Sequence, residues 1–430
     1  MATKTASLAR ALARASVFLA TASFLLAGCA SGTSSGSVKA GVGVDTSAKT
    51  ITLGVLTPLT TAVGTLIGVP LTHGVETYFD YLNDNGGITV GSDHYKVKLL
   101  EEDSKYNVAT HVQGYNDIHN KVAMIAESLG SPTTAAITQL ANTDKLLVSA
   151  ATLDSGLARQ PYMVMVGTPY RLQVENAFDY VVNQVGDKTA PVAIIYQNDP
   201  YGQDGLAGYQ EAKTAYKLND VDQQNFVYNA AGSDVTAQVV HLKATGAKYV
   251  FVSATPSDAL KIIGTGAQLG YTPQWIWQSP CFASFQLALA PSLVPLMEHN
   301  VWVVAGGASW GDTSKPGMAL MLQNVAKYMP AQKPDGFFQF GYTESIITAA
   351  ILQKAASNGD LTRDGLFNAF NSLSDVDLGE LLPDAHYGPT PNQRVPSRDN
   401  IIYAIDHTAV GDVKPISNDF VGTAAAASSF

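Results

Sequence analysis

Apolar and polar residues follow two alternating patterns from residue 50 onward. Residues 51–56 are almost continuously apolar, a pattern typical of a strand buried on both faces. Between Leu71 and Leu82, apolar residues recur mainly at spacings of three and four, which places them on one face of a helix. Residues 83–87 include two glycines, which can end that helix in the left-handed conformation. The first predicted unit is therefore a buried strand followed by an amphipathic helix.

The same unit recurs along the chain in two series, the second of which starts after Pro191. The later predicted segments are strands at 95–100, 122–126, 146–149, 192–196, 250–252, 275–277, 301–304 and 400–405, and helices at 109–120, before 216, and at 258–269, 318–328 and 343–356. Continuously apolar strands separated by helices predict parallel sheets covered by helices on both faces. We therefore predict an α/β fold of two doubly wound parallel-sheet lobes joined by a multi-crossing hinge.

The order of these segments sets the predicted domain organisation. Lobe 1 is assigned to residues 50–168 plus 307–390, and lobe 2 to residues 169–306 plus 391–415. Residues 416–430 are predicted to be a disordered tail, because the chain ends in small and polar residues. Two such lobes enclose a cleft lined by the carboxyl ends of their strands, and a cleft of this kind is a preferred ligand site.

The amino-terminal segment has the pattern of a secretory signal. Three basic residues precede a short apolar stretch, which ends in Leu-Ala-Gly-Cys at residues 26–29. This pattern resembles a bacterial lipoprotein signal, and the resemblance implies a signal peptide at residues 1–28 and lipidation of Cys29. Residues 29–49, which include a Gly/Ser-rich run, are predicted to be a flexible linker. The alternative is a buried helix that happens to contain a cysteine. We expect membrane attachment through the lipid anchor only.

Composition and charge exclude several classes of protein. The chain has 26 Lys and Arg against 36 Asp and Glu, a net charge of −10 that argues against nucleic acid as a partner. With 46% hydrophobic residues it is not a mainly disordered protein. Two cysteines cannot form a disulfide scaffold or a cysteine-based zinc site, and we expect Cys281 to be a free, buried or half-buried thiol.

Catalytic motifs are missing from the sequence. The eight histidines are scattered, and neither a His-Glu-x-x-His pair, a Gly-x-Ser-x-Gly elbow nor a phosphate-binding loop occurs. We therefore predict that the chain is not an enzyme and has no metal or cofactor. Acid/base pairs that meet only in the folded protein keep an enzyme open as the competing class.

Five short segments resemble a known family. Residues 51–60, 85–88, 129–134, 147–152 and 199–202 occur in the order and spacing seen in substrate-binding proteins similar to the leucine/isoleucine/valine-binding protein. The resemblance implies a type I periplasmic-binding-protein fold that closes on a small ligand. It also implies delivery of that ligand to an ABC transporter, made of a permease and its ATPase.

The resemblance also implies a ligand site at the ends of the predicted strands. A serine in the position of Ser131 holds the ligand carboxylate in the family, and Ala151 and Thr152 match positions that offer backbone and hydroxyl contacts. The tyrosine that matches Tyr201 closes onto the ligand from the second lobe. The alternatives are an ordinary N-cap role for Ser131 and a packing role for Tyr201 in its turn.

Other positions depart from the amino-acid-binding members. Ser279, beside Gln278, replaces the acidic residue that pairs with the ligand ammonium, and Thr255 and Ile67 replace two tyrosines. A buried ammonium group without an anionic partner is strongly disfavoured, so we do not expect a standard amino acid as the ligand. Three aspartates are the alternative sources of the missing charge: Asp154, Asp199 and Asp258.

Aromatic residues are candidates for an apolar wall. Phe338, Gln339 and Phe340 fall where the family places an aromatic contact. Trp275, Trp277 and Phe282 could enlarge that wall, and a core position is the alternative for both tryptophans.

Together these features predict an extracytoplasmic substrate-binding lipoprotein of an ABC importer. We expect a monomer that captures a small, partly apolar solute carrying a carboxylate or another acceptor end. The alternatives are binding of a branched-chain or other amino acid, and a ligand sensor that is read by a separate signalling partner.

Overall fold

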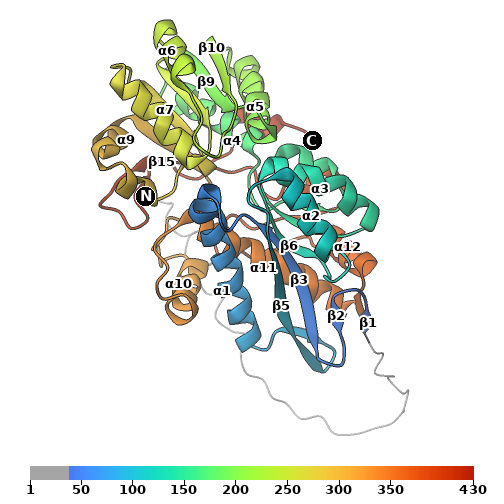
Figure 1. The fold of residues 1–430 in the computed structure, drawn as a ribbon. Helices are drawn as coiled ribbons and strands as arrows, with labels where there is room; N and C mark the ends of the chain where they lie inside the picture. Colours follow the sequence, from blue (N-terminus) through green and yellow to red (C-terminus); the bar gives the residue numbers. More distant parts are fainter. Residues whose placement is uncertain (1–37) are drawn as a thin grey trace, which may run out of the picture. The chain divides into compact units, whose positions relative to one another are not determined.

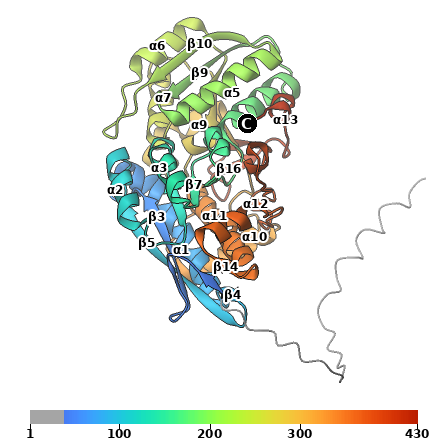
Figure 2. The ribbon, with the colours of Figure 1, turned by 90° about the vertical axis from the view of Figure 1, so that its right-hand side faces the viewer.

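The protein, seen in a computed structural model that describes residues 38–430, is built on two separate seven-stranded sheets, beside which lies a small two-stranded one (Figure 1; Figure 2). The predicted signal peptide, Cys29 and the first part of the predicted linker lie outside the described residues. Within 38–430, no single helix is long and apolar enough to cross a membrane, although a pair at Ser279–Leu289 and Pro291–Asn300, bent by 113°, passes by length and composition together.

Lobe 1 is built on a sheet with the strand order β4-β5-β3-β6-β7-β8, in which β2 also pairs with β3. The pairs formed by β3 with β5 and β6, by β6 with β7 and by β7 with β8 are parallel. Its strands are β2 (Val44–Asp45), β3 (Thr50–Thr57), β4 (Ile88–Val90), β5 (Asp93–Asp103), β6 (Ile125–Leu129), β7 (Val148–Ala151) and β8 (Met163–Val164). The central strands are buried on both faces, as their continuous apolar runs predict.

Helices cover both faces of the lobe 1 sheet. One core cluster joins the sheet to α1, α11 and α12, and another joins it to α2 and α3. Helices α1 and α11 pack along each other, although they are far apart in the sequence (Figure 1). The helices are α1 (Val69–Asp84), α2 (Val108–Ile118), α3 (Ser131–Asp144), α10 (Pro316–Tyr328), α11 (Gly336–Ser357) and α12 (Arg363–Asn371).

Lobe 2 is built on a second sheet, with the order β10-β9-β11-β12-β13-β15-β16. The pairs from β10 to β13 are parallel, whereas β15 and β16 join antiparallel. Its strands are β9 (Pro191–Gln197), β10 (Asn219–Phe226), β11 (Tyr249–Ser253), β12 (Gln274–Gln278), β13 (Val301–Ala305), β15 (Ile401–Ile405) and β16 (Val413–Pro415). Its helices are α4 (Tyr170–Asp179), α5 (Pro200–Tyr216), α6 (Thr236–Thr245), α7 (Pro256–Gln268), α8 (Phe285–Leu289) and α9 (Val294–Asn300).

The chain passes between the two sheets three times, in segments 165–169, 306–315 and 372–400. These segments are tied to one another: the hydroxyl of Thr168 donates a hydrogen bond to the carbonyl of Asp399 at 2.8 Å. The predicted fold of two parallel-sheet lobes with several crossings is confirmed. The predicted lobe boundaries fall in or at the edges of these segments.

The carboxyl-terminal residues differ from the predicted disordered tail at 416–430. Helix α13 (Thr423–Ala427) packs against α4 and α5. The N–H of Gly422 donates to Asn176 Oδ1 at 2.7 Å, and the N–H of Ala424 donates to the hydroxyl of Tyr216 at 2.9 Å. The prediction is corrected because contacts with α4 and α5 stabilise a short helix that would not form alone, and its small alanine side chains allow this close packing.

The end of the predicted linker at 29–49 also has regular structure. Strand β1 (Lys39–Ala40) pairs in parallel with β14 (Asp360–Leu361), and β2 pairs with β3. Both pairings depend on partners distant in sequence or on a very short strand, so the local composition did not indicate them.

Candidate ligand-binding site

A cavity of about 250 Å³ lies between the two lobes. Lobe 1 contributes residues just after β6 and β7, and lobe 2 contributes residues just after β11 and β12. Residues of all three connecting segments complete the wall. The cavity therefore lies where parallel sheets generally bind ligands, beyond the carboxyl ends of their strands.

The wall of this cavity is mainly apolar and aromatic. Among the residues that the structure describes, the charged side chains of the wall are limited to one carboxyl group, that of Asp335. The aromatic residues of the wall are Tyr106, Tyr170, Tyr201, Phe282, Trp310, Phe337, Phe340 and Tyr403. Such a wall suits a ligand that buries an apolar body and presents few polar groups.

Ser131 lies in the wall at the start of α3. The N-cap of α3 is Gly130, so the alternative of an N-cap role for Ser131 is wrong. Gly130 has φ of 102°, and a Cβ there would lie 2.5 Å from the Tyr106 ring. The Ser131 hydroxyl lies 2.6 Å from the Thr152 hydroxyl, at the end of the neighbouring strand. This hydroxyl pair, next to first-turn amides that lack helical acceptors, can bind a carboxylate oxygen.

Tyr201 lines the cavity from lobe 2, in the first turn of α5 rather than in a loop. Its ring packs edge-on against Tyr170, with centroids 4.7 Å apart. Its hydroxyl is directed to the carbonyl of Ala254 at 3.4 Å and to Sγ of Cys281 at 3.8 Å. The ring of Tyr201 therefore lines the cavity, whereas its hydroxyl contacts groups inside lobe 2.

Of the other three residues predicted to contact the ligand from lobe 2, two line the cavity and one lies in the interior of the lobe. Thr255 and Ser279 line the cavity, at the starts of α7 and of the turn after β12. Gln278 does not line the cavity, because the alternation of the strand turns its side chain inward, where Nε2 donates to the carbonyl of Tyr170 at 2.9 Å. Its predicted contact with the ligand is corrected to support of the wall.

The start of α11 corrects the predicted aromatic contact. Gln339 lines the cavity, but Phe338 is fully buried in lobe 1, where its ring packs against Trp310 at 5.7 Å between centroids. Phe340, the third residue of the predicted contact, lines the cavity, and Phe337 lines it in place of Phe338. The helix begins at Gly336, earlier than predicted, and a spacing of three places those two phenylalanines on one face.

The remaining candidates are placed as follows. Ile67 and Ala151 of lobe 1 and Phe282 of lobe 2 line the cavity. Trp275 and Trp277 are fully buried in the lobe 2 core and do not line it. The thiol of Cys281 is buried, as predicted, and burial raises its pKa to about 12.

Asp335 was not identified from the sequence. It caps α11, with Oδ1 accepting hydrogen bonds from the N–H groups of Phe337 at 2.8 Å and Phe338 at 3.2 Å. Burial raises the pKa of its carboxyl group to about 6. An aspartate directly before an apolar run is an N-cap signal, which could have indicated both the helix start and this residue.

The three aspartates considered earlier as sources of negative charge lie outside the wall. Asp154 and Asp199 accept hydrogen bonds from the N–H groups of Gly156 and Gly202, which follow them in the chain. Asp258 binds Ser233. Within 38–430, no group of three or more His, Cys, Asp or Glu side chains is arranged to hold a metal ion.

Several wall residues carried no local signal in the sequence. Tyr170, Trp310 and Tyr403 lie in or beside the connecting segments, and they reach the cavity only because the chain crosses between the lobes there. Their positions follow from the tertiary fold rather than from periodicity.

Solved structures share this architecture. A fatty acid ABC transporter substrate-binding protein from Thermomonospora curvata is 24% identical, with a TM-score of 0.82 over 91% of this chain and 97% of that chain. A branched chain amino acid ABC transporter protein from Thermus thermophilus with bound valine is 17% identical, with a TM-score of 0.74 over 87% and 97%. A possible leucine/isoleucine/valine-binding protein from Rhodopirellula baltica SH 1 is 19% identical, with a TM-score of 0.72 over 86% and 97%. These likenesses show the type I periplasmic-binding-protein fold.

A search of curated proteins finds no match. The family model described as "Periplasmic binding protein" matches residues 50–409, which include most of both lobes and nearly the whole cavity wall. The chain therefore belongs to the periplasmic binding protein family, a family of binding proteins and not of enzymes.

Proposed function

We propose that this protein is the extracytoplasmic substrate-binding component of an ABC importer, and that it captures an apolar solute with a carboxylate or another acceptor end. Membership of the family supports ligand capture. Several similar structures are named as ABC transporter substrate-binding proteins, which supports a permease and its ATPase as partners.

The observation that carries the ligand class is the composition of the wall. Its many aromatic and aliphatic side chains favour burial of a hydrocarbon body, at about 0.8 kcal/mol per methylene group. The hydroxyls of Ser131 and Thr152, beside the first turn of α3, provide a polar end. A carboxylate bound there would receive charge-assisted hydrogen bonds without any basic side chain.

An amino acid fits this wall less well than a simple acid. An ammonium group needs an anionic partner, and Asp335 is the one carboxyl group that the described wall offers. Its Oδ1 already accepts two backbone hydrogen bonds, and the raised pKa shows that burial disfavours its charge. Aliphatic or aromatic acids are therefore the preferred class, and amino acids are the second candidate because one neighbour holds valine.

Attachment and closure complete the proposal. The lipoprotein-like segment ending at Cys29 supports a lipid anchor on the outer side of the membrane. The three connecting segments can act as hinges between an open arrangement and the ligand-binding one, and a ligand that bridges the lobes favours the ligand-binding one. Cys29→Ser should release the protein from membranes, and persistent attachment would contradict the anchor.

A sensor that serves a separate signalling partner would share these features. The two functions are distinguished by whether purified permease and ATPase accept the ligand from this protein.

A thermal-shift panel on the Cys29→Ser protein tests the ligand class. Dodecanoate, phenylacetate, leucine and valine are compared at equal concentration, since a ligand that binds only the folded protein raises its melting temperature. We expect dodecanoate or phenylacetate to raise it and the amino acids to leave it unchanged. A shift with leucine or valine alone would assign the amino-acid class instead.

A further inference from the structure

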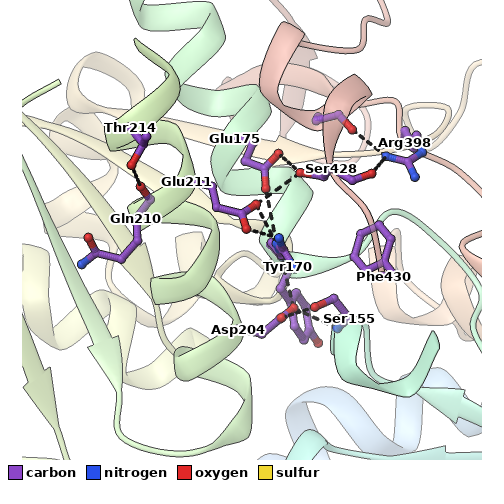
Figure 3. Close-up of polar contacts among 12 residues, drawn as sticks. Ser155, Tyr170, Glu175, Asp204, Gln210, Glu211, Thr214, Arg398, Ser428 and Phe430 are labelled. Atoms are coloured by element: carbon purple, nitrogen blue, oxygen red, sulfur yellow. Dashed lines mark hydrogen bonds and ion pairs between the residues drawn. The ribbon is translucent and has the colours of Figure 1, made fainter. Parts of the chain in front are cut away.

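A buried carboxyl group on lobe 2 contacts lobe 1 directly behind the cavity wall. Asp204 of α5 accepts hydrogen bonds from the backbone N–H of Ser155, at 2.9 Å, and from the Ser155 hydroxyl. Ser155 begins a short helical turn, Ser155–Arg159, in lobe 1, shortly after Thr152 in the wall. Both residues are buried. Figure 3 shows their side chains directed at each other beside Tyr170.

The lobe 2 side of this contact is held in place. The same carboxylate accepts a hydrogen bond from the backbone N–H of Arg171, at 3.2 Å, near the start of α4. The guanidinium of Arg171 binds Glu211 of α5 through two nitrogens, with Nε 2.8 Å from Oε2. Helices α4 and α5 pack along each other. Asp204 therefore moves with lobe 2, and its bonds to Ser155 are the ones that cross to lobe 1.

The contact also supports two residues of the cavity wall. The N–H of Tyr170, next to Arg171, donates to the carbonyl of Leu153 at 2.9 Å across the two lobes. Tyr170 is further held by Gln278, whose amide donates to its carbonyl. A lobe rotation that broke the bonds to Ser155 would pull Tyr170 away from Leu153 and open the wall.

We propose that Asp204 and Ser155 form an interlobe latch, a pair of positioning residues that holds the lobes in the ligand-binding arrangement before a ligand enters. The inference rests on the proposed capture of a ligand between the lobes. The latch favours this arrangement because a buried acceptor that loses its donors is left unsatisfied until water reaches it. A ligand then finds a wall that is already assembled, which lowers the ordering cost of binding.

The separation of the lobes in the unliganded protein tests the latch without any ligand. Spin labels are attached to cysteines introduced at two exposed sites, Gln113 on α2 and Ala244 on α6, in the Cys29→Ser background. Double electron–electron resonance then gives the distribution of distances between the labels. We expect Asp204→Asn and Ser155→Ala to add a population at longer distance, with the larger population in Asp204→Asn because its uncharged amide weakens all three hydrogen bonds, whereas Ser155→Ala removes one.

Two further variants separate the latch from general destabilisation. Ser155→Thr keeps the hydroxyl and should restore the wild-type distribution. Ser233→Ala is the matched control, since Ser233 donates through its N–H and hydroxyl to Asp258 in the same way, but within lobe 2. It should lower the melting temperature without changing the label distance. Identical distributions for wild type, Ser155→Ala and Asp204→Asn would overturn the latch.

A second readout links the latch to binding. Dodecanoate dissociation is followed by stopped-flow tryptophan fluorescence, with Trp310 in the wall as the reporter. Asp204→Asn should dissociate about tenfold faster, the factor expected for one buried hydrogen bond to a charged group. If wild type binds no dodecanoate but Asp204→Asn widens the distances, the latch stands and the ligand class is wrong. If dodecanoate binds and the variants change neither distance nor rate, the latch is wrong and the ligand class stands.

Discussion

Single hydroxyl and carboxyl groups decide which ligand end this cavity accepts. Ser131 and Thr152 share a hydrogen bond between their hydroxyls, and a carboxylate bound there accepts from both. Asp335 provides the opposing influence, because its charge repels an acid and attracts an amine. The hydroxyl pair favours a carboxylate, and the Asp335 carboxyl group disfavours one. Substitutions at these positions therefore distinguish binding of a simple acid from binding of an amino acid.

Ser131→Ala should weaken dodecanoate binding about tenfold, since a hydrogen bond to a charged group is lost. Calorimetric titration measures the change. Thr138→Ala is the matched control, because it removes a buried hydroxyl from the same helix, one that bonds to the carbonyl of Thr134 outside the wall. Equal losses of affinity in the two variants would assign Ser131 a structural role.

Acidification should tighten the binding of a carboxylate. The pKa of Asp335 is raised to about 6 by burial, so its charge is present at pH 7.5 and largely lost at pH 5. Loss of this repulsion predicts roughly threefold tighter dodecanoate binding at pH 5.5 than at pH 7.5. Asp335→Asn should remove the pH dependence. An affinity that falls on acidification, together with leucine binding, would identify Asp335 as the partner of an ammonium group.

Among the elements, continuous apolar runs predicted β3 and β9 well, because burial on both faces leaves a direct record in the sequence. Strand β6 was predicted at 122–126 and lies three residues later, at Ile125–Leu129. The start of α11 was not predicted. The predicted helix began at residue 343, and the N-cap at Asp335 was not recognised. Phe338 was therefore expected in the cavity wall, although it lies in the core. Helix α13 depends on packing against α4 and α5, which no local pattern records.

The interior of lobe 1 should lose stability as the pH rises. Glu127 of β6 and Glu344 of α11 are buried, burial raises the pKa of Glu127 to about 8, and burial and then the neighbouring Glu127 raise the pKa of Glu344 strongly. Because these folded-state pKa values exceed the unfolded ones, the stabilisation is present below about pH 4.5 and is lost as the pH rises to about 8. The free energy of unfolding should fall by roughly 1.4 kcal/mol per pH unit for each group.

Chemical denaturation between pH 5 and 9 checks this expectation. Glu127→Gln should flatten the dependence and stabilise the protein at pH 8, whereas Glu380→Gln, at an exposed side chain, should leave it unchanged. A steep dependence that survives in Glu127→Gln and in Glu344→Gln would show that other groups cause it.

Removal of the carboxyl-terminal segment should destabilise lobe 2. Deletion of residues 421–430 removes α13 and the hydrogen bond from the Ser428 hydroxyl to Glu175, at 2.7 Å (Figure 3). It also exposes the faces of α4 and α5 that α13 covers. We expect the melting temperature to fall by about 5 °C, measured by circular dichroism. An unchanged melting temperature would show that the segment does not contribute to stability.

At the scale of the whole molecule, ligand capture depends on two sheets that present their carboxyl ends to one cavity. The order of the strands predicted this arrangement. The family resemblance pointed to Ser131 and Thr152, and both lie at strand ends in the wall. The connecting segments and their wall residues, such as Trp310, could not be predicted in the same way. Their place is fixed by how the lobes meet, which involves residues far apart in the sequence.

Capture of an apolar acid in the cavity is tested by calorimetric titration of dodecanoate into the Cys29→Ser protein. We expect saturable binding of one molecule per chain with a negative heat-capacity change, because apolar surface is buried in the cavity. Tight binding of leucine or valine, with no heat from dodecanoate or phenylacetate, would contradict it.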